Sequence, residues 1–145
     1  MNDIALDERL EAGTFPVTEL PLCRVLLMDD TRFTWVVLVP RQPNVSEVFE
    51  LSADDQTQLW REAGALADAM KEGFEGDKMN IATLGNVVSQ LHIHIIVRHH
   101  SDAAWPGPVW GVGEPISYDL EHQGDVRDRL LALIEGLDLD PENNV

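Results

Sequence analysis

The pattern of apolar and polar residues predicts a β-hairpin early in the chain and two more strands beyond its middle. Apolar, β-branched runs at about 21–28 and 33–40 flank the polar turn DDTR, as the two arms of a hairpin would. The stretch KMNIATLGNVVSQLHIHIIVR begins as a strand, turns around Gly85 and continues as a long strand from about 88 to 98. These strands are joined by short turns.

Three other segments have the spacing of helices. The clearest begins after Ser52, a residue suited to cap a helix, and carries one apolar stripe made of Leu59, Ala63, Leu66 and Met70. A short helix is expected at about 4–12, where Gly13 ends it, and a last one at about 124–136. The tail after the last helix is expected to fray.

The order of these elements indicates the fold class. Strands and helices segregate along the chain rather than alternating strictly, which favours an α+β fold with an antiparallel sheet. The length of 145 residues suits one domain, and a hydrophobic content of 44% is enough for a packed core. Since no internal repeat or linker is visible, residues 1–145 are expected to form a single domain.

Charge and composition exclude several classes of partner. The 26 acidic residues outnumber the 10 basic ones, and a net charge of −16 argues against nonspecific binding to nucleic acid or to an anionic membrane. No apolar run reaches the ~18–20 residues of a membrane helix, and the acidic N-terminus is unlike a secretory signal. A cytoplasmic location is therefore expected. The single cysteine, Cys23, fits a reduced compartment and is predicted to be an inert buried thiol.

Candidate chemistry is concentrated in the stretch QLHIHIIVR. Side chains on a strand alternate between two faces, so Gln90, His92 and His94 are expected to share one face. The other face carries Leu91, Ile93, Ile95 and Val97, which are apolar enough to pack against a helix. The strand therefore places groups that exchange protons near neutral pH above a buried apolar row.

Three interpretations of the two histidines remain open on this pattern alone. They could be solvated residues without a role, which is the commonest outcome for an isolated H-x-H pair. They could bind a metal ion together with His99 or His100, although no nearby carboxylate or cysteine completes a ligand set. They could also act in nucleophilic catalysis, in which one imidazole attacks phosphorus and its neighbours bind the oxyanion and the leaving group.

The residues around the pair resemble the histidine triad (HIT) family over about residues 20–111. The family signature is a glycine, a short apolar link and then His-φ-His-φ-His-φ-φ on a strand, where φ is apolar. Gly85 lies five residues before Gln90, so Gln90 takes the first position, His92 the middle one and His94 the third. In another register His92 would come first, His94 second and Ile96 third, but the spacing from Gly85 argues against it. The strand VVLVPR and the segment WPGP also match.

The resemblance implies a HIT-like α+β fold, with an antiparallel sheet of about five strands, a long helix packed on one face, and a homodimer. It also implies a nucleotide hydrolase or transferase, acting for example on a diadenosine polyphosphate or a nucleoside phosphoramidate. His92 would attack the α-phosphorus and form a nucleotidyl-histidine intermediate. His94 would bind phosphate oxygens, and Gln90 would occupy the position that usually helps the leaving group. No metal or other cofactor is expected.

Six further residues are candidates for contacting the substrate, namely Asp29, Asp30, Asn80, Gly85, Asn86 and Arg98. The two asparagines are neutral hydrogen-bonding groups, and a turn at Gly85 can offer backbone N–H groups to an anion. The two aspartates fall where family members often hold the ribose, although turn residues need no such role. Arg98 shares the histidine face and could meet phosphate, but pairing with a carboxylate is favoured.

Several positions depart from the family pattern. Glutamine can only hydrogen-bond and cannot act as a general acid, so leaving groups that need a proton would depart slowly. Val87 replaces a serine that the family often uses near the phosphate, and Trp35 and Pro43 replace upstream histidines. These changes support an alternative function, which is nucleotide binding with weak or lost turnover. The tryptophans Trp105 and Trp110 are expected to pack as buried aromatics.

Overall fold

The computed structural model describes residues 4–143, in which one antiparallel sheet carries the fold. The strand order across the sheet is β1–β2–β3–β5–β4, and every neighbouring pair is antiparallel. The strands are β1 (Thr14–Glu19), β2 (Cys23–Met28), β3 (Thr34–Pro40), β4 (Lys78–Ala82) and β5 (Ile93–Arg98). The predicted α+β class, the antiparallel sheet and the β2–β3 hairpin are therefore confirmed.

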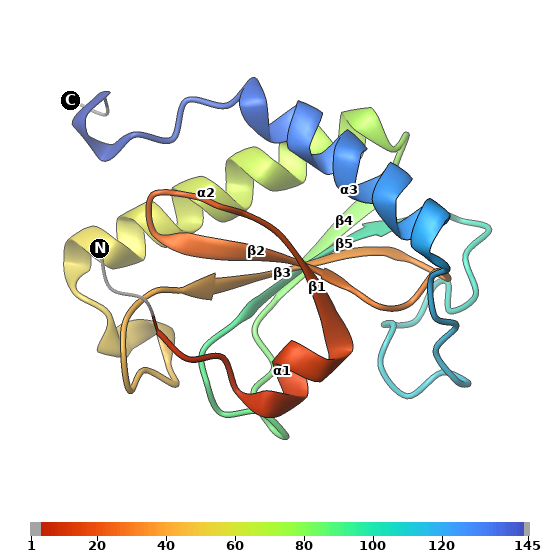
Figure 1. Ribbon diagram of the computed structural model, residues 1–145, viewed down its shortest axis with the longest axis horizontal. Helices are drawn as coiled ribbons and strands as arrows, with labels where there is room; N and C mark the ends of the chain where they lie inside the picture. The colour runs from red at the N-terminus through yellow and green to blue at the C-terminus, as the bar shows by residue number, and fades with distance from the viewer. Residues whose placement is uncertain (1–3, 144–145) are drawn as a thin grey trace.

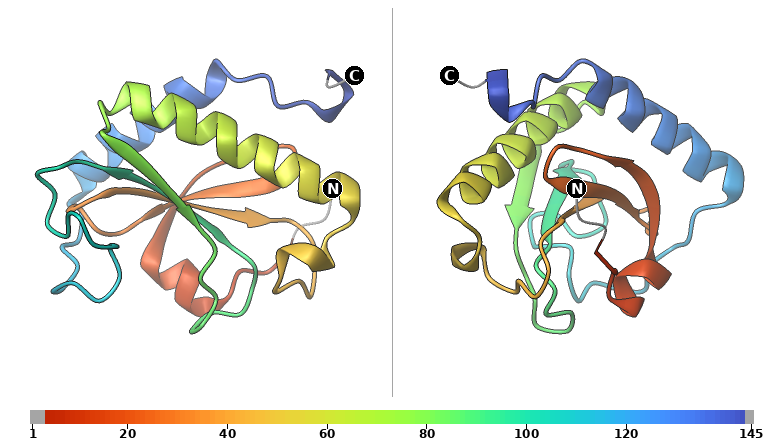
Figure 2. Two further views of the ribbon diagram at one scale, coloured as in Figure 1. Left: turned by 180° about the vertical axis from the view of Figure 1, so that it is seen from behind. Right: turned by 60° about the vertical axis from the view of Figure 1, so that its left-hand side comes forward.

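The helices lie on the two faces of the sheet. The long helix α2 (Ala53–Gly73) and α3 (Leu120–Glu135) cover one face, and α1 (Glu8–Gly13) lies on the other (Figures 1 and 2). Two short 3₁₀ helices, η1 (Val48–Glu50) and η2 (Pro141–Asn143), complete the set. None of the helices within residues 4–143 has the length and apolar character that crossing a membrane requires.

The main core lies between the sheet and the two long helices. The predicted stripe of α2, from Leu59 to Met70, packs there against Ile93 and Ile95 of β5. A smaller core covers the opposite face and joins Leu10 of α1 to strand residues such as Val37. The histidine face of β5 is therefore the face opposite α2, as the alternation predicts.

The first strand was not predicted from the sequence. In β1 the run TFPVTE contains Pro16, which has no N–H to donate, and the pairing of β1 with β2 shifts register between Pro16 and Thr18. Proline is tolerated because β1 lies at the edge of the sheet. A strand with such a break shows little of the regular alternation on which prediction depends.

The predicted bounds of both terminal helices were wrong because capping residues decide where a helix begins. α1 begins at Glu8 rather than near residue 4, since the carboxylate of Asp7 accepts a hydrogen bond from Arg9 N. α3 begins at Leu120 rather than 124, since the side chain of Asp119 accepts from His122 N. In the tail that is expected to fray, Leu139 O accepts a hydrogen bond from Gln58 Nε2 of α2.

The strand predicted at 88–98 is shorter than expected and begins at Ile93. β4 ends at this point, since its last residue, Ala82, pairs with His94. The pairing with β3 also stops, at Leu38 and Ile93, although β3 continues to Pro40. Before Ile93 the chain leaves the ladder, and Leu91 N donates to Val45 O instead. Gln90 and His92 thus lie just outside the strand.

A buried carboxylate, unnoticed in the sequence, holds the start of β2 to α2. Glu62 is fully buried and accepts hydrogen bonds from Leu22 N, Cys23 N and Gln58 Nε2 at 2.7–2.9 Å. Burial raises the pKa of the Cys23 thiol well above its ordinary value, and the negative charge of Glu62 adds to the effect. The thiol is thus buried, as predicted.

The geometry around Glu62 predicts a large loss of stability for Glu62→Gln. The amide has one acceptor oxygen, and its NH₂ group would face a donor, so at least one buried N–H group loses its partner. We expect the free energy of unfolding to fall by about 2 kcal/mol, measured by urea denaturation. Glu72→Gln, on the exposed side of the same helix, is the control and should change it by less than about 0.5 kcal/mol. Equal effects of the two substitutions would contradict the assignment.

Candidate functional site

His92 and His94 lie side by side on the sheet face opposite α2. Their ring centroids are 4.8 Å apart, and each residue is only 4% exposed. His94 belongs to β5 and pairs with Val37 of β3, while His92 immediately precedes the strand. The structure thus places the two imidazoles next to each other in a largely enclosed position.

His94 is held neutral by its surroundings. Burial lowers the pKa of His94 to about 4, and the nearby charge of a protonated His92 contributes. Trp35 Nε1 donates to His94 Nδ1 at 3.0 Å, and the ring of Trp110 lies 5.0 Å away. Because Nδ1 accepts, the proton of the neutral ring is on Nε2, which is left as a hydrogen-bond donor. Trp35, one of the departures from the family pattern, thereby orients His94.

The backbone next to His92 decides its tautomer. His92 Nδ1 lies 2.6 Å from the carbonyl oxygen of Gln90. A carbonyl can only accept, so Nδ1 carries the proton, and Nε2 of the neutral ring keeps a free lone pair. The two histidines therefore have opposite tautomers, with a lone pair on Nε2 of His92 and a proton on Nε2 of His94.

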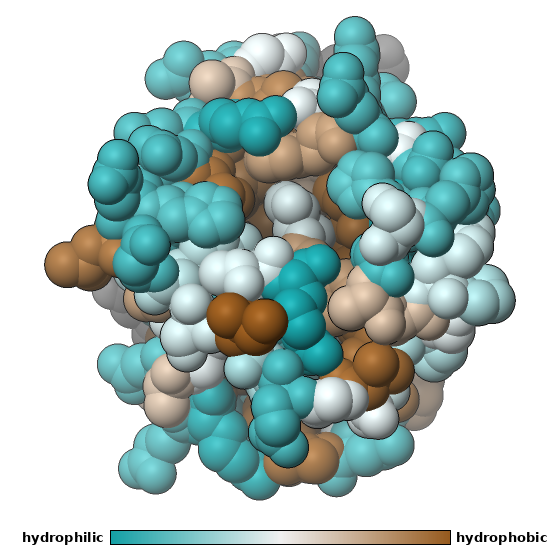
Figure 3. All heavy atoms as spheres, turned by 90° about the vertical axis from the view of Figure 1, so that its right-hand side faces the viewer, coloured by the Kyte–Doolittle hydropathy of each residue, from teal (hydrophilic) through white to brown (hydrophobic). Residues whose placement is uncertain are grey.

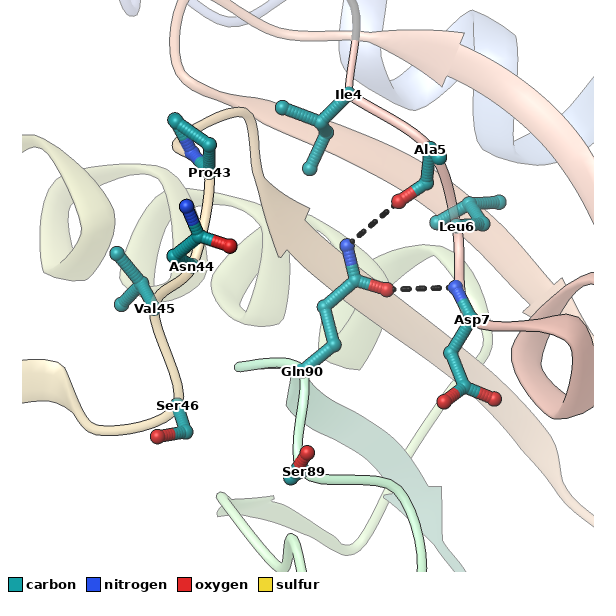
Figure 4. Close-up of a pocket in the computed structure, with 10 residues that line it drawn as sticks. All are labelled: Ile4, Ala5, Leu6, Asp7, Pro43, Asn44, Val45, Ser46, Ser89 and Gln90. Carbon is teal, nitrogen blue, oxygen red and sulfur yellow. Dashed lines mark hydrogen bonds between the residues drawn. The ribbon is translucent and has the colours of Figure 1, made fainter.

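The side chain of Gln90 lines a pocket of about 680 Å³ (Figure 4). Residues 4–7 form one wall of this pocket and residues 43–46 the other. Gln90 Oε1 accepts from Asp7 N at 2.7 Å, and Gln90 Nε2 donates to Ala5 O at 3.0 Å. Both ends of the amide are thus bonded to the backbone of the N-terminal segment.

Gly85 and Asn86, both exposed, line a second pocket of about 300 Å³. Ser46 and Ser89 line both this pocket and the pocket of Gln90. Two of the six predicted substrate contacts therefore lie on a surface that continues to Gln90.

Arg98 and Asn80 lie toward the other end of β5 and bind each other. Arg98 is 2% exposed, and its guanidinium donates to Asp102 at 2.8 and 3.0 Å, to Asn80 Oδ1 at 2.8 Å and to Gly107 O at 2.8 Å. Although burial alone would raise the pKa of the Asp102 carboxyl, bonds from Arg98 and from backbone N–H groups lower it. The favoured alternative for Arg98, pairing with a carboxylate, is the arrangement that the structure shows.

Asp29 and Asp30 join the β2–β3 turn to the loop before α3. Asp29 Oδ1 accepts from Tyr118 N at 2.8 Å, and the buried Asp30 binds the guanidinium of Arg32 at 2.9 and 3.0 Å. Figure 3 views the molecule from this end and shows hydrophilic residues around a few hydrophobic ones. Neither aspartate lines the pockets beside Gln90. Their contacts are those of turn residues that anchor a loop.

The remaining histidines of the motif region are directed elsewhere. His99 Nε2 donates to Phe74 O at 3.1 Å, and His100 Nδ1 lies 3.4 Å from a carboxylate oxygen of Asp77. Neither joins His92 and His94, and residues 4–143 contain no group of three or more His, Cys, Asp or Glu side chains that could hold a metal ion. The structure therefore does not assemble the ligand set of the metal-site interpretation.

Both a family model and solved structures match this chain. The HIT domain model matches residues 9–101. A crystal structure of a histidine triad protein from Marinobacter aquaeolei VT8 is 49% identical, covers 92% of this chain and 98% of that one, and superposes with a TM-score of 0.89. A histidine triad protein from Sinorhizobium meliloti 1021 is 41% identical, with coverage of 88% and 95% and a TM-score of 0.87.

More distant similarity extends to the fold alone. A structure described as a hypothetical histidine triad nucleotide-binding protein, from Sulfolobus tokodaii strain7, is 18% identical over 88% of this chain and 87% of that one, with a TM-score of 0.65. A search of curated proteins finds no match.

The low pKa of His94 predicts that the fold loses stability as the pH falls. Histidine in an unfolded chain takes up a proton near pH 6.5, whereas folded His94 stays neutral down to about pH 4. Between these values the unfolded state binds the extra proton, so the free energy of unfolding falls, by roughly 3 kcal/mol over the whole interval. Above about pH 7 the His94 side chain is neutral in both the folded and the unfolded state, so its full contribution to the free energy of unfolding is present.

Urea denaturation at several pH values between about 7 and 4 measures this effect. His94→Asn cannot titrate, so its stability should fall less steeply than that of the wild type over the same interval. His122→Asn, which replaces an exposed histidine, is the control and should keep the wild-type slope. Parallel curves for the wild type and His94→Asn would contradict the prediction.

Proposed function

Because the chain belongs to the histidine triad family, we propose that it is a nucleotide hydrolase or nucleotidyl transferase in which His92 is the nucleophile. The substrate is a nucleoside phosphate derivative, attacked at the α-phosphorus. The assignment of Gln90, His92 and His94 to the first, middle and third positions of the triad is part of this proposal.

The observation that carries the proposal is the hydrogen bond between His92 Nδ1 and the carbonyl of Gln90. It leaves the lone pair of Nε2 available to attack phosphorus, and the carbonyl stabilises the positive charge that the ring acquires. The bond from phosphorus to the leaving group breaks as the phosphorus–nitrogen bond forms. Water or another acceptor then attacks phosphorus, the phosphorus–nitrogen bond breaks, and the imidazole is restored.

His94 supports the same chemistry from the adjacent position. Its Nε2–H group, fixed by the bond from Trp35, can donate to a phosphate oxygen. Because His94 is neutral and buried, it stabilises negative charge as an oriented donor and not as a cation. The exposed Gly85 and Asn86 can supply further hydrogen bonds to the phosphate.

Gln90 limits which leaving groups depart readily. It has no acidic proton, so the proposed enzyme favours leaving groups that are stable as anions, such as a polyphosphate, over groups that must be protonated. The alternative function is nucleotide binding with weak turnover, and the 4% exposure of both imidazoles favours it, because a substrate must gain access to them. Homodimer formation and a cytoplasmic location stay predictions.

Replacement of the nucleophile tests the proposal. We expect His92→Asn to lose activity toward a diadenosine polyphosphate or an adenosine phosphoramidate by about a thousandfold or more, because no covalent intermediate can form. Steady-state hydrolysis assays measure the loss. His100→Asn, which replaces an exposed histidine bonded to Asp77, should keep wild-type activity. Wild-type turnover in His92→Asn would contradict the mechanism.

Trapping the intermediate separates catalysis from binding alone. Rapid acid quenching of the wild type with substrate, followed by intact-protein mass spectrometry, should show one added nucleoside monophosphate on His92. Titration calorimetry with AMP measures affinity independently. Binding of AMP by a wild type that shows neither adduct nor turnover would establish the alternative, a nucleotide-binding protein.

A further inference from the structure

The side chain of Gln90 behaves like the backbone of one residue in a neighbouring parallel strand. It accepts from Asp7 N at 2.7 Å and donates to Ala5 O at 3.0 Å, and these two residues lie two positions apart in the N-terminal segment. In a parallel ladder the N–H and C=O groups of one residue bond to residues two apart in the same way. The pairing needs a donor and an acceptor side by side, which a primary amide provides. An imidazole, with its two nitrogens directed apart, does not.

The segment that Gln90 holds covers the sheet face that carries the histidines. Ile4, Leu6 and Leu10 pack with Trp35 and Val37 in the smaller core. Gln90 links this segment to His92, since its side chain accepts from Asp7 N and its carbonyl binds His92 Nδ1. The segment is therefore placed beside the proposed nucleophile.

The same segment makes one wall of the pocket that Gln90 lines. Figure 4 shows Gln90 between residues 4–7 and residues 43–46, with its amide directed to the former. The carbonyl of Gln90 binds His92 Nδ1, so a single residue contacts both the nucleophile and the wall. If residues 4–7 moved away, the pocket would lose that wall, and the sheet face that carries the histidines would lose its cover.

We propose that Gln90 is a positioning residue, which holds residues 5–7 over the histidine face so that the N-terminal segment forms one wall of the pocket for the departing part of the substrate. Its catalytic consequence rests on the proposed function. Gln90 thus has a structural role of its own, in addition to lacking the acidic proton of a triad histidine. Gln90→His would break both bonds to the segment and would not yield a better catalyst for poor leaving groups.

Amide hydrogen exchange tests the structural part without any need for turnover. The N–H group of Asp7 donates to Gln90 Oε1, so Gln90→Leu should raise its exchange rate by roughly tenfold or more, the effect of one net hydrogen bond. The matched control is Gln56→Leu, which removes a similar bond from a glutamine amide to Leu51 O. It should leave the Asp7 rate unchanged. Unchanged protection of Asp7 in Gln90→Leu would overturn the proposal.

The near-isosteric Gln90→Glu provides a second test that is independent of side-chain size. The introduced carboxyl can replace both bonds only when it is protonated, because a carboxylate would repel Ala5 O. A carboxylate still accepts from Asp7 N, but its repulsion from Ala5 O weakens the pairing, so protection of Asp7, relative to the wild type at the same pH, should be lower near pH 7 than toward about pH 4. The charged or titratable groups around this position are Asp7, its partner Arg9 and His92, with Glu50 beyond Ser46. Relative protection that does not rise as the pH falls would overturn the proposal.

Kinetics test the catalytic part. A series of nucleotide substrates whose leaving groups differ in pKa gives the dependence of the rate on the leaving group. Gln90→Leu and Gln90→His should raise KM severalfold more than they lower kcat, and that dependence should stay as in the wild type. A large gain for Gln90→His on poor leaving groups would overturn the proposal. If the wild type shows no turnover, the proposed function fails, whereas the exchange results still decide the role of Gln90.

Discussion

The burial of β5 inside the sheet is the constraint on which the rest of the structure depends. This strand lies between β3 and β4, and all six of its residues are buried. One face meets α2 and is filled by isoleucine and valine, whereas the other carries His94 and Arg98. Because a buried polar group without a partner is costly, each polar residue on that face requires fixed hydrogen-bonding neighbours. Trp35 meets this need for His94, and Asp102, Asn80 and Gly107 meet it for Arg98.

These fixed neighbours also decide the tautomers of the two histidines. Trp35 can only donate and the carbonyl of Gln90 can only accept, so the two adjacent imidazoles take opposite tautomers. A lone pair and a proton then lie on the Nε2 atoms of neighbouring rings, which is the combination that attack on phosphorus and binding of a phosphate oxygen require. The same contacts that satisfy the polar groups in the fold therefore give the two histidines the arrangement that the proposed reaction requires.

Gln90 has one interpretation from the sequence and another from the structure. From its spacing to Gly85 it is predicted to take the first triad position, where it cannot release a proton. As a structural element it bonds to the backbone of residues 5 and 7 and contacts His92 through its own carbonyl. The N-terminal segment, which lies outside the stretch of family resemblance, becomes part of the surroundings of the site.

The sequence by itself determined the hairpin, the apolar stripe of α2 and the faces of β5, because backbone geometry imposes these periodicities within a few residues. It also indicated the histidine pair through its spacing from Gly85. Only the tertiary structure decided the irregular edge strand β1, the burial of Glu62 and the bonds from Trp35 to His94 and from Gln90 to the N-terminal segment. The bond from Trp35 to His94 joins residues 59 positions apart, and the bonds of Gln90 join residues 83 and 85 positions apart. Such contacts follow from how the whole chain packs, and no local pattern encodes them.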